Sequence, residues 1–333
     1  MSNKLNKWKD FLLKSSIPLE YEVKTLLDKY GCVGNYEYTY LRRDESEIVN
    51  EFSYDIDASF IKGGHFFDLM IECKYRDQST NWVFTPESYG GISEINSYSF
   101  INPNDHFTQK KKFFELDYEP LAPLCGKGIE INSEGQNPKS ISQAMNQLSY
   151  AMAEKILDGM EHQIERLLGS SEIIFYHIPI IVTTANLFRL NENVTIEQIK
   201  QSNDLSDVST EAECLILKSP IGKDLEKYNI EIFYRFIDKY SKDYLNKKLK
   251  SFNEDIGFVL SVIAKNYCPG AFAVIHFSKG NVGFKSLFEY LNEIVEPTEK
   301  TFNRERKNKK RMEELTKKLN EFKINKAKPK NKE

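Results

Sequence analysis

The order of the predicted elements indicates an α/β protein with one central mixed sheet flanked by helices. Hydrophobic periodicity predicts a helix, three strands, a second helix and a further strand within the first 188 residues. This order lacks the strict strand–helix alternation of a doubly wound fold. The chain also contains neither a GxGxxG nor a GxxxxGK[ST] motif, so the sequence offers no sign of a dinucleotide or ATP site of those kinds.

The first predicted elements are a helix and a three-stranded meander. Residues 7–30 have a helical periodicity that is broken near Pro18, and Gly31 is a natural helix end. Gly63-Gly64 predicts a tight hairpin turn, so the second and third strands are expected to be antiparallel neighbours. The three strand-like runs cover 35–41, 51–61 and 65–75.

The next segment is an insertion, followed by the second helix. Residues 77–138 have mixed polarity, many turn residues and weak periodicity, so no element is assigned within them. An amphipathic helix is predicted over 139–156, and a strongly apolar strand over 172–188. Residues 1–188 are therefore expected to form a core domain with an insertion at about 77–138.

The C-terminal half predicts an α/β elaboration over residues 189–296, packed on this core. The final segment, 297–333, is expected to be a basic tail that is helical over 301–322. The elements predicted within the elaboration are strands over 212–220 and 270–277 and helices at about 224–250 and 283–294.

The formal net charge of -3 conceals a basic tail on an acidic body. Residues 297–333 hold 14 Lys and Arg against 6 Asp and Glu, a balance of +8, whereas the rest of the chain carries -11. Such a tail is consistent either with contact to nucleic acid or with a solvated terminal extension. The sequence leaves both interpretations open.

The composition indicates a soluble, cytoplasmic protein. The chain is 40% hydrophobic and 29% charged, and no run approaches the roughly 18 apolar residues of a membrane span. The N-terminus lacks the apolar core of a signal peptide. The five cysteines include no pair at metal-ligand spacing, which favours reduced cytoplasmic thiols over disulfides or a zinc site.

The residues best suited to chemistry lie on the second and third predicted strands. Glu72 and Lys74 are two residues apart, so they share one face of a strand, while Cys73 points to the opposite face. Asp55 and Asp57 are likewise two apart on the neighbouring strand. If the two strands form the predicted hairpin, then Asp57, Glu72 and Lys74 converge at one edge of the sheet.

Two carboxylates on a rigid sheet form the oxygen-rich site that Mg²⁺ or Mn²⁺ prefers. A lysine beside them can orient an attacking water and offset the charge of a phosphate. The structural alternative is a set of strand-end charges paired with one another or with solvent. The Glu-x-Lys spacing alone does not decide between these, because it occurs four times and only the copy at Glu72 lies in an apolar strand.

The order of a helix with Glu, a strand with Asp and a strand with Glu-x-Lys resembles the PD-(D/E)XK nuclease superfamily, which has the restriction-endonuclease-like fold. The matching pieces are PLEYEVKTLLDKYG, FSYDIDAS and FDLMIECKYR. The resemblance implies that Asp57 and Glu72 are metal ligands and that Lys74 is the catalytic lysine. Glu20, eleven residues before the glycine that ends the first helix, takes the place of an auxiliary acid, and Glu22 is the alternative.

The resemblance also implies the fold of the core: a helix, a three-stranded hairpin meander, a helix and a strand around a central mixed sheet. Residues 139–156 would be its second helix and 172–184 its fourth strand. Asp55 and Gln147 are candidate auxiliary residues. Some branches of the family place a glutamine on the second helix with a tyrosine four residues later, but Tyr150 follows Gln147 at three, which favours a solvent-facing glutamine.

These observations predict a metal-dependent nuclease that hydrolyses phosphodiester bonds with Mg²⁺ or Mn²⁺ as cofactor. Analogy with the family makes DNA the expected substrate, endonuclease action the expected mode, and restriction or anti-phage defence the expected setting. The chain could act as a homodimer or with a protein partner that supplies recognition. The alternative is a catalytically silent nucleic-acid-binding or assembly subunit of a larger complex.

Overall fold

The computed structural model describes residues 7–43, 49–88, 101, 103–109, 116, 118–165, 167–249 and 255–327. The helices of these segments are α1 (Lys7–Lys14), α2 (Ile17–Lys29), α3 (Ser140–Glu165), α4 (Ile196–Gln201), α5 (Lys223–Tyr240), α6 (Lys242–Lys248), α7 (Ile256–Asn266), α8 (Val282–Val295) and α9 (Glu299–Ala327). The strands are β1 (Val33–Arg43), β2 (Val49–Lys62), β3 (His65–Lys74), β4 (Asn81–Pro86), β5 (Pro103–Asn104), β6 (Leu124–Asn132), β7 (Gly135–Asn137), β8 (Ile174–Thr183), β9 (Asn186–Leu190), β10 (Ser209–Ala212), β11 (Cys214–Lys218) and β12 (Ala271–His276).

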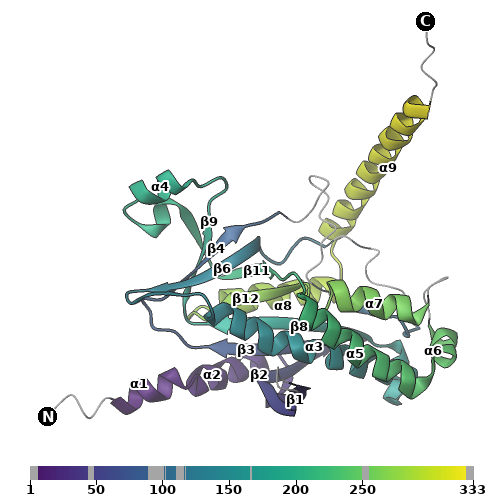
Figure 1. Ribbon diagram of the computed structural model, residues 1–333, viewed down its shortest axis with the longest axis horizontal. Helices are drawn as coiled ribbons and strands as arrows, with labels where there is room; N and C mark the ends of the chain where they lie inside the picture. Colours follow the sequence, from purple (N-terminus) through teal and green to yellow (C-terminus); the bar gives the residue numbers. More distant parts are fainter. Residues whose placement is uncertain are drawn as a thin grey trace, which may run out of the picture.

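The fold is α/β: a twelve-stranded mixed sheet runs through the described part of the chain, and helices cover it (Figure 1). The strand order is β1-β2-β3-β8-β12-β11-β6-β4-β9-β10, with β5 beside β8 and β7 beside β6. The predicted α/β class with a central mixed sheet is therefore confirmed. In the described segments, no helix is both long and apolar enough to cross a membrane.

The N-terminal elements follow the sequence prediction closely. The first helix is divided between α1 and α2, with Ser16 in the left-handed region (φ 64°) and Pro18 in the first turn of α2. The predicted hairpin joins β2 and β3, which are antiparallel neighbours. Gly63 and Gly64 both have positive φ, 59° and 81°, as a two-residue hairpin turn requires.

Strand β8 lies at the centre of the sheet and explains the most apolar run of the sequence. All ten of its residues are buried, and it pairs in parallel with β3 on one side and β12 on the other. A parallel strand covered on both faces has no solvent-facing side, so its residues need not alternate in polarity. The apolar run predicted over 172–188 is in fact two strands, because β9 follows β8 after a short turn.

Strands from distant parts of the sequence complete the sheet. Residues 77–138, left without elements by the sequence, supply β4 and β6 as well as the shorter β5 and β7. Strands β11 and β12 come from the C-terminal half, yet they lie between β8 and β6 in the same sheet. The described sheet is thus continuous across the predicted boundary at 188/189.

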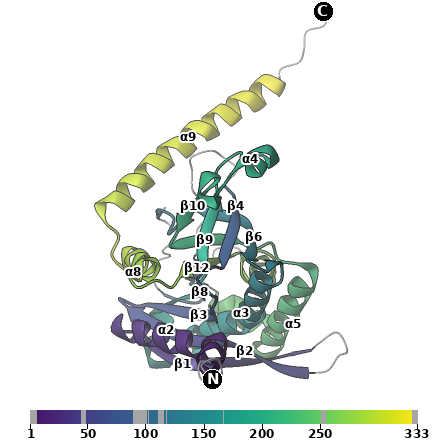
Figure 2. The same ribbon diagram turned by 90° about the vertical axis from the view of Figure 1, so that its left-hand side faces the viewer.

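Two layers of helices cover the two faces of the sheet (Figure 2). Helices α2 and α8 bury apolar residues such as Val23, Leu27 and Leu287 against one face. Helices α3, α5 and α7 pack on the other face, where Tyr54 and Met70 of the hairpin join their cluster. The predicted helix at 224–250 is divided between α5 and α6, and the sequence did not predict α4, α7 or β10. Helix α9 extends away from the body (Figure 1).

We expect Gly283→Ala to destabilise the protein because the backbone of α8 packs tightly against its neighbours at this glycine. A Cβ there would lie 2.6 Å from the backbone oxygen of Glu213 and 2.7 Å from Cγ2 of Ile275. Overpacking against a backbone atom costs about 1–3 kcal/mol, and chemical denaturation would measure it. Gly280→Ala is the matched control, since its Cβ would meet nothing nearer than 3.4 Å. Equal stability of the two variants would contradict this account.

Candidate active site

The candidate site begins where the pairing of β2 with β3 stops. The ladder pairs Asp57 with Met70 and ends with Ile56 opposite Ile71. Continuing the same register places Asp55 opposite Glu72. At this point a side chain replaces the backbone acceptor of the ladder. Oδ2 of Asp55 accepts a hydrogen bond of 2.6 Å from the backbone N–H of Cys73. This contact holds the Asp55 side chain beside Glu72.

A local irregularity of β1 accompanies this change. The ladder between β1 and β2 pairs Tyr36 with Ile56 and Tyr38 with Tyr54, but the intervening pair is missing from it. Glu37, the residue skipped on β1, has φ 57°, which is uncommon for a residue with a side chain. Such irregularities re-aim side chains at sheet edges. Here the Glu37 carboxylate acts electrostatically on Asp55.

Lys74 is held at the site by two side chains. Its Nζ donates to Oε1 of Glu72 at 2.5 Å and to Oε1 of Gln147 on α3 at 3.2 Å. The Gln147 amide is itself oriented, because its Nε2 donates to the backbone oxygen of Ser53 at 3.3 Å. The Tyr40 hydroxyl also donates to the backbone oxygen of Gln147. Lys74 therefore has a defined position between a strand carboxylate and a helix amide.

Glu72 is a buried acid with unused capacity. Only 1% of it is exposed, and its Oε2 has no hydrogen-bond partner among the described residues. Burial raises the pKa of Glu72 to about 8, the neighbouring Asp55 adds to the rise, and Lys74 opposes it. A carboxyl group in this environment loses its proton readily only when a further positive charge binds beside it.

Glu20 adds a third carboxylate to this environment. It lies in the first turn of α2 and is partly buried. Burial raises the pKa of Glu20 to about 7, with further contributions from Asp55 and Glu37, while Lys74 lowers it. The mutual effects among Glu20, Asp55, Glu72 and Lys74 indicate that the four charged groups share one region at the end of β3. We call these four residues, together with Gln147, the Glu72 cluster.

Asp57 belongs to a different cluster, under α3. Its two carboxylate oxygens accept hydrogen bonds of 2.9 and 3.1 Å from Nζ of Lys155, and the Tyr54 hydroxyl donates to Oδ1 at 2.6 Å. Lys155 also forms an ion pair of 3.2 Å with Asp68. Asp68 in turn lies 3.0 Å from Nδ1 of His177, which must carry the proton because a carboxylate can only accept.

In this second cluster, each of the two carboxylates has partners within the chain. Burial raises the pKa of Asp57, and repulsion from Asp68 adds to that rise, although Lys155 opposes it. Burial also acts to raise the pKa of Asp68, but the hydrogen bond from His177 and the charge of Lys155 outweigh it, so the pKa falls below its ordinary value. Because its ammonium binds both carboxylates, Lys155 occupies the position that a metal ion between them would take.

The beginning of α3 is fixed to the sheet by Glu130 of β6, and this positions Gln147 two turns later. Oε2 of Glu130 accepts hydrogen bonds from Ser140 Oγ at 2.6 Å, from Trp82 Nε1 at 2.9 Å and from Arg76 Nε at 2.5 Å. Arg76 follows Lys74 by two residues, so one buried carboxylate joins the end of β3 to the start of α3.

The donor set of the Glu72 cluster suits a hard divalent cation. Its free groups are carboxylate oxygens, and one of them, Oε2 of Glu72, is buried without a partner. Across the described segments, no three His, Cys, Asp or Glu side chains are close enough together to form a complete metal site. Mg²⁺ commonly binds through one or two carboxylates and retains several waters, so Asp55 and Glu72 suffice as protein ligands for it.

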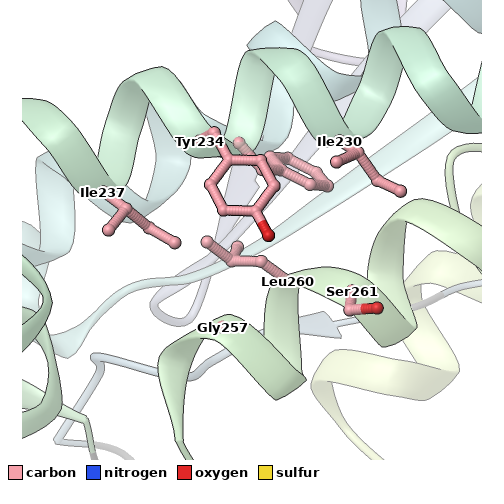
Figure 3. A pocket seen from close by; sticks show the side chains of 7 residues that line it. Ile230, Tyr234, Ile237, Gly257, Leu260 and Ser261 are labelled. Atoms are coloured by element: carbon pink, nitrogen blue, oxygen red, sulfur yellow. The ribbon is translucent and has the colours of Figure 1, made fainter.

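Two hollows in the described structure have linings that include no residue of the Glu72 cluster. One, of about 70 Å³, lies between α5 and α7 and is lined by Tyr234, Leu260 and neighbouring apolar residues (Figure 3). It contains no carboxylate, amine or imidazole. The other, of about 380 Å³, lies between α3 and the start of α5, with Asn146, Ser149 and Lys223 in its lining.

The structure places the predicted site residues in two clusters. Glu20, Glu72 and Lys74 share one environment, as expected, and Cys73 is buried in the α2-side core behind them. The expected convergence of Asp57 with Glu72 and Lys74 is replaced by its ion pair with Lys155, and Asp55 lies beside Glu72 instead. Gln147, interpreted as solvent-facing, contacts Lys74, which corrects that interpretation.

Comparison with family models, with curated proteins and with solved structures yields no match for this chain.

We expect Lys155→Met to destabilise the protein by about 3–5 kcal/mol at pH 8, because it leaves Asp57 and the buried Asp68 without their cation. Without Lys155 the folded-state pKa of Asp57, already raised by burial, rises further, and the pKa of Asp68 rises because one of the charges that lower it is lost. The folded state then holds extra protons, so the penalty grows as the pH rises from about 4 to 8. Urea unfolding at several pH values would measure it.

The control for this experiment is Lys24→Met, which removes a surface ion pair of 3.3 Å with Asp28. Surface pairs of this kind contribute at most about 1 kcal/mol. If Lys155→Met cost no more than Lys24→Met at pH 8, the Asp57–Lys155–Asp68 contacts would not be the stabilising network described above.

We expect Glu72→Gln to relieve a pH-dependent cost of folding. The pKa of Glu72 is about 8 in the folded protein and near 4.5 in the unfolded chain, so wild-type stability falls as the pH rises between these values. The glutamine cannot ionise. The stability of the variant relative to wild type should therefore increase from pH 5 to pH 8.5, by on the order of 2–4 kcal/mol.

The same substitution at Glu22, which is exposed on α2, provides the control. Glu22→Gln should leave the pH dependence of unfolding unchanged. An identical pH dependence of unfolding in wild type, Glu72→Gln and Glu22→Gln would show that Glu72 ionises normally in the folded protein.

Proposed function

We propose that this chain is a metal-dependent nuclease with a restriction-endonuclease-like core, which hydrolyses phosphodiester bonds. The observation that carries the proposal is the buried Glu72, whose free oxygen lies in a cluster with Asp55 and Glu20 and whose other oxygen binds Lys74. A divalent cation would offset the excess of carboxylates, and the fixed lysine beside them would offset the charge of a phosphate.

Within this proposal, Asp55 and Glu72 hold Mg²⁺ or Mn²⁺, and Glu20 supports them. Asp55 replaces Asp57 in the proposed ligand pair because Asp55 contacts the backbone next to Glu72, whereas Asp57 is already paired with Lys155. A bound divalent ion would lower the pKa of its water and offset the negative charge that develops on the phosphate.

Lys74 and Gln147 perform the remaining tasks. The Lys74 ammonium lies between Glu72 Oε1 and Gln147 Oε1, so it can donate its third proton to a phosphate oxygen or to the attacking water. Gln147 positions Lys74 and prevents it from swinging toward solvent. Preorganised donors of this kind cost no reorganisation when the substrate charge changes.

The order of elements around the cluster supports the same proposal. Helix α2, the β1–β2–β3 meander, helix α3 and strand β8 follow one another, and β8 pairs in parallel with β3. The carboxylates and the lysine lie at the carboxyl end of β3, where helices α2 and α3 each contribute one side chain. DNA is the proposed substrate by analogy with nucleases of this core, and fold analogy by itself does not define a substrate.

A catalytically silent nucleic-acid-binding or assembly subunit is the second candidate. It is favoured by the lack of a complete three-ligand metal site among the described residues. The two candidates differ in one observable, which is metal-dependent cleavage by the isolated chain.

We expect the wild-type chain to cut DNA with Mg²⁺ or Mn²⁺ and to be inactive in EDTA. Linear, supercoiled and single-stranded DNA, together with RNA, would identify the substrate. Lys74→Ala and Asp55→Asn should each lower the cleavage rate by about 100-fold or more, because each removes a group that contacts the reacting phosphate or its metal.

The matched control is Asp57→Asn, which should retain activity within a few-fold of wild type at temperatures where it stays folded. Thermal melts of all variants would separate loss of activity from loss of structure. Strong loss in Asp57→Asn with full activity in Asp55→Asn would reverse the assignment of the metal ligand. Inactive wild type with both metals and every substrate would favour the silent subunit.

A further inference from the structure

The N-terminal helix α1 has no buried residue. Trp8 and Phe11 are 59% and 69% exposed, and Leu12 is 43% exposed. Their spacing of three and four residues places them on one face of the helix. Ile17 and Tyr21 of α2, 58% and 64% exposed, extend the apolar surface beyond the break. Exposed apolar patches of this kind often mark binding surfaces.

Positive charge is interleaved with these rings. Helix α1 contains Lys7, Lys9 and Lys14 against a single acid, Asp10. Lys7 and Lys14 lie four and three residues from Phe11, so they flank its ring, and Nζ of Lys9 lies 5.8 Å from the centre of the Trp8 ring. Exposed aromatic rings with lysines between them are the means by which proteins bind unpaired nucleic-acid strands.

Helix α1 adjoins the Glu72 cluster. The residue that links α1 to α2, Ser16, accepts a hydrogen bond at its Oγ from the backbone N–H of Tyr75, which directly follows Lys74. Asp10 in the middle of α1 acts electrostatically on Tyr75. The first turn of α2 then contains Glu20 itself. In Figure 1, α1 continues the line of α2 outward toward the N-terminus.

We propose that α1 and the start of α2, defined by Trp8, Phe11, Ile17 and Tyr21, form the binding surface for unpaired bases of the substrate strand. This inference rests on the proposed nuclease function and names its substrate class as single-stranded nucleic acid or a duplex with an unpaired end. Bases stack on Trp8 and Phe11, while the lysines contact phosphates and lead the strand toward Lys74.

The charges of α1 favour this occupant over the others. A second copy of the chain would bring two lysine-rich helices together, and like charges repel. A lipid surface against α1 would cover the end of β3 next to Tyr75. A nucleic-acid strand matches both the positive charge and the rings of α1, and it would lie next to the proposed cleavage site. Glu20 and Glu22 make the start of α2 acidic, so the phosphates would contact α1.

The two tryptophans of the chain allow a direct test, because Trp82 is fully buried while Trp8 is exposed. The full-length Lys74→Ala variant in EDTA would be titrated with an oligothymidine of about 15 nucleotides and with a duplex of equal length. We expect the oligothymidine to quench the Trp8 emission at concentrations where the blunt duplex has no effect. Trp8→Phe, made in the same background, should abolish the quench.

Affinity would be measured separately, by the anisotropy of a labelled oligothymidine. Phe11→Ala should weaken binding by about tenfold, since each stacked base contributes about 1–3 kcal/mol. The matched control is Phe258→Ala on α7, because Phe258 is similarly exposed at 59% but lies on another helix layer. Equal affinity of Phe11→Ala and Phe258→Ala would overturn the proposal.

Three further results would also overturn it. The first is equal quenching of Trp8 by the blunt duplex. The second is a blue shift of the Trp8 emission with anionic phosphatidylserine vesicles, without a response to the oligothymidine. The third is a dimer, seen by light scattering, that the Phe11→Ala substitution dissociates. Binding through α1 by a wild-type chain that cleaves nothing would reject the nuclease and keep the surface. Cleavage of single strands by Phe11→Ala with the same KM as wild type would keep the nuclease and reject the binding surface.

Discussion

The burial of the Glu72 carboxylate at the end of a core strand is the constraint on which the site depends. Strand β3 has β2 on one side and β8 on the other, and helices cover both faces, so Glu72 cannot turn toward water. An isolated buried carboxylate is costly, and proteins keep one only with a compensating charge or by retaining its proton. Lys74 supplies part of that compensation, and the free Oε2 shows that it is incomplete.

The two acidic clusters of the hairpin differ in this respect. Asp57 and Asp68 share Lys155, and Asp68 also binds His177, so both carboxylates of that cluster have partners within the chain. The Glu72 cluster sets three carboxylates against one lysine, and the pKa values of Glu72 and Glu20 rise to about 8 and about 7 as a result. Buried carboxyl groups whose pKa is raised because the chain does not fully compensate their charge are a property of binding sites more than of structural ion pairs.

The rest of the fold supplies rigidity to this arrangement. The Thr183 hydroxyl at the end of β8 donates to the backbone oxygen of Lys74 at 2.9 Å, and the Thr184 hydroxyl donates to that of Arg76 at 2.7 Å. These contacts hold the end of β3 in place. Beyond β8, the C-terminal strands β12 and β11 extend the sheet, so residues far along the sequence support the Glu72 cluster through the sheet. Precise positioning of a site requires such support.

The sequence by itself determined the local features of this protein, because they depend on neighbouring residues. The break near Pro18, the Gly63-Gly64 turn, the shared face of Glu72 and Lys74 and the buried strand β8 all follow from periodicity and turn chemistry. The sequence also singled out Glu20 and Asp55 as candidates. It did not predict that β4, β6, β11 and β12 would join one sheet, since pairing between distant strands leaves no local pattern.

Only the tertiary structure distinguishes the surroundings of Asp55 from those of Asp57. Both lie on the same strand two residues apart, so a regular strand would treat them alike. The irregularity at Glu37 and the end of the β2–β3 ladder turn Asp55 toward the backbone of Cys73, while Lys155, ninety-eight residues away in sequence, pairs with Asp57. Gln147 reaches Lys74 for the same reason: the packing of α3 on the sheet, which no local spacing encodes, determines which of its faces meets β3.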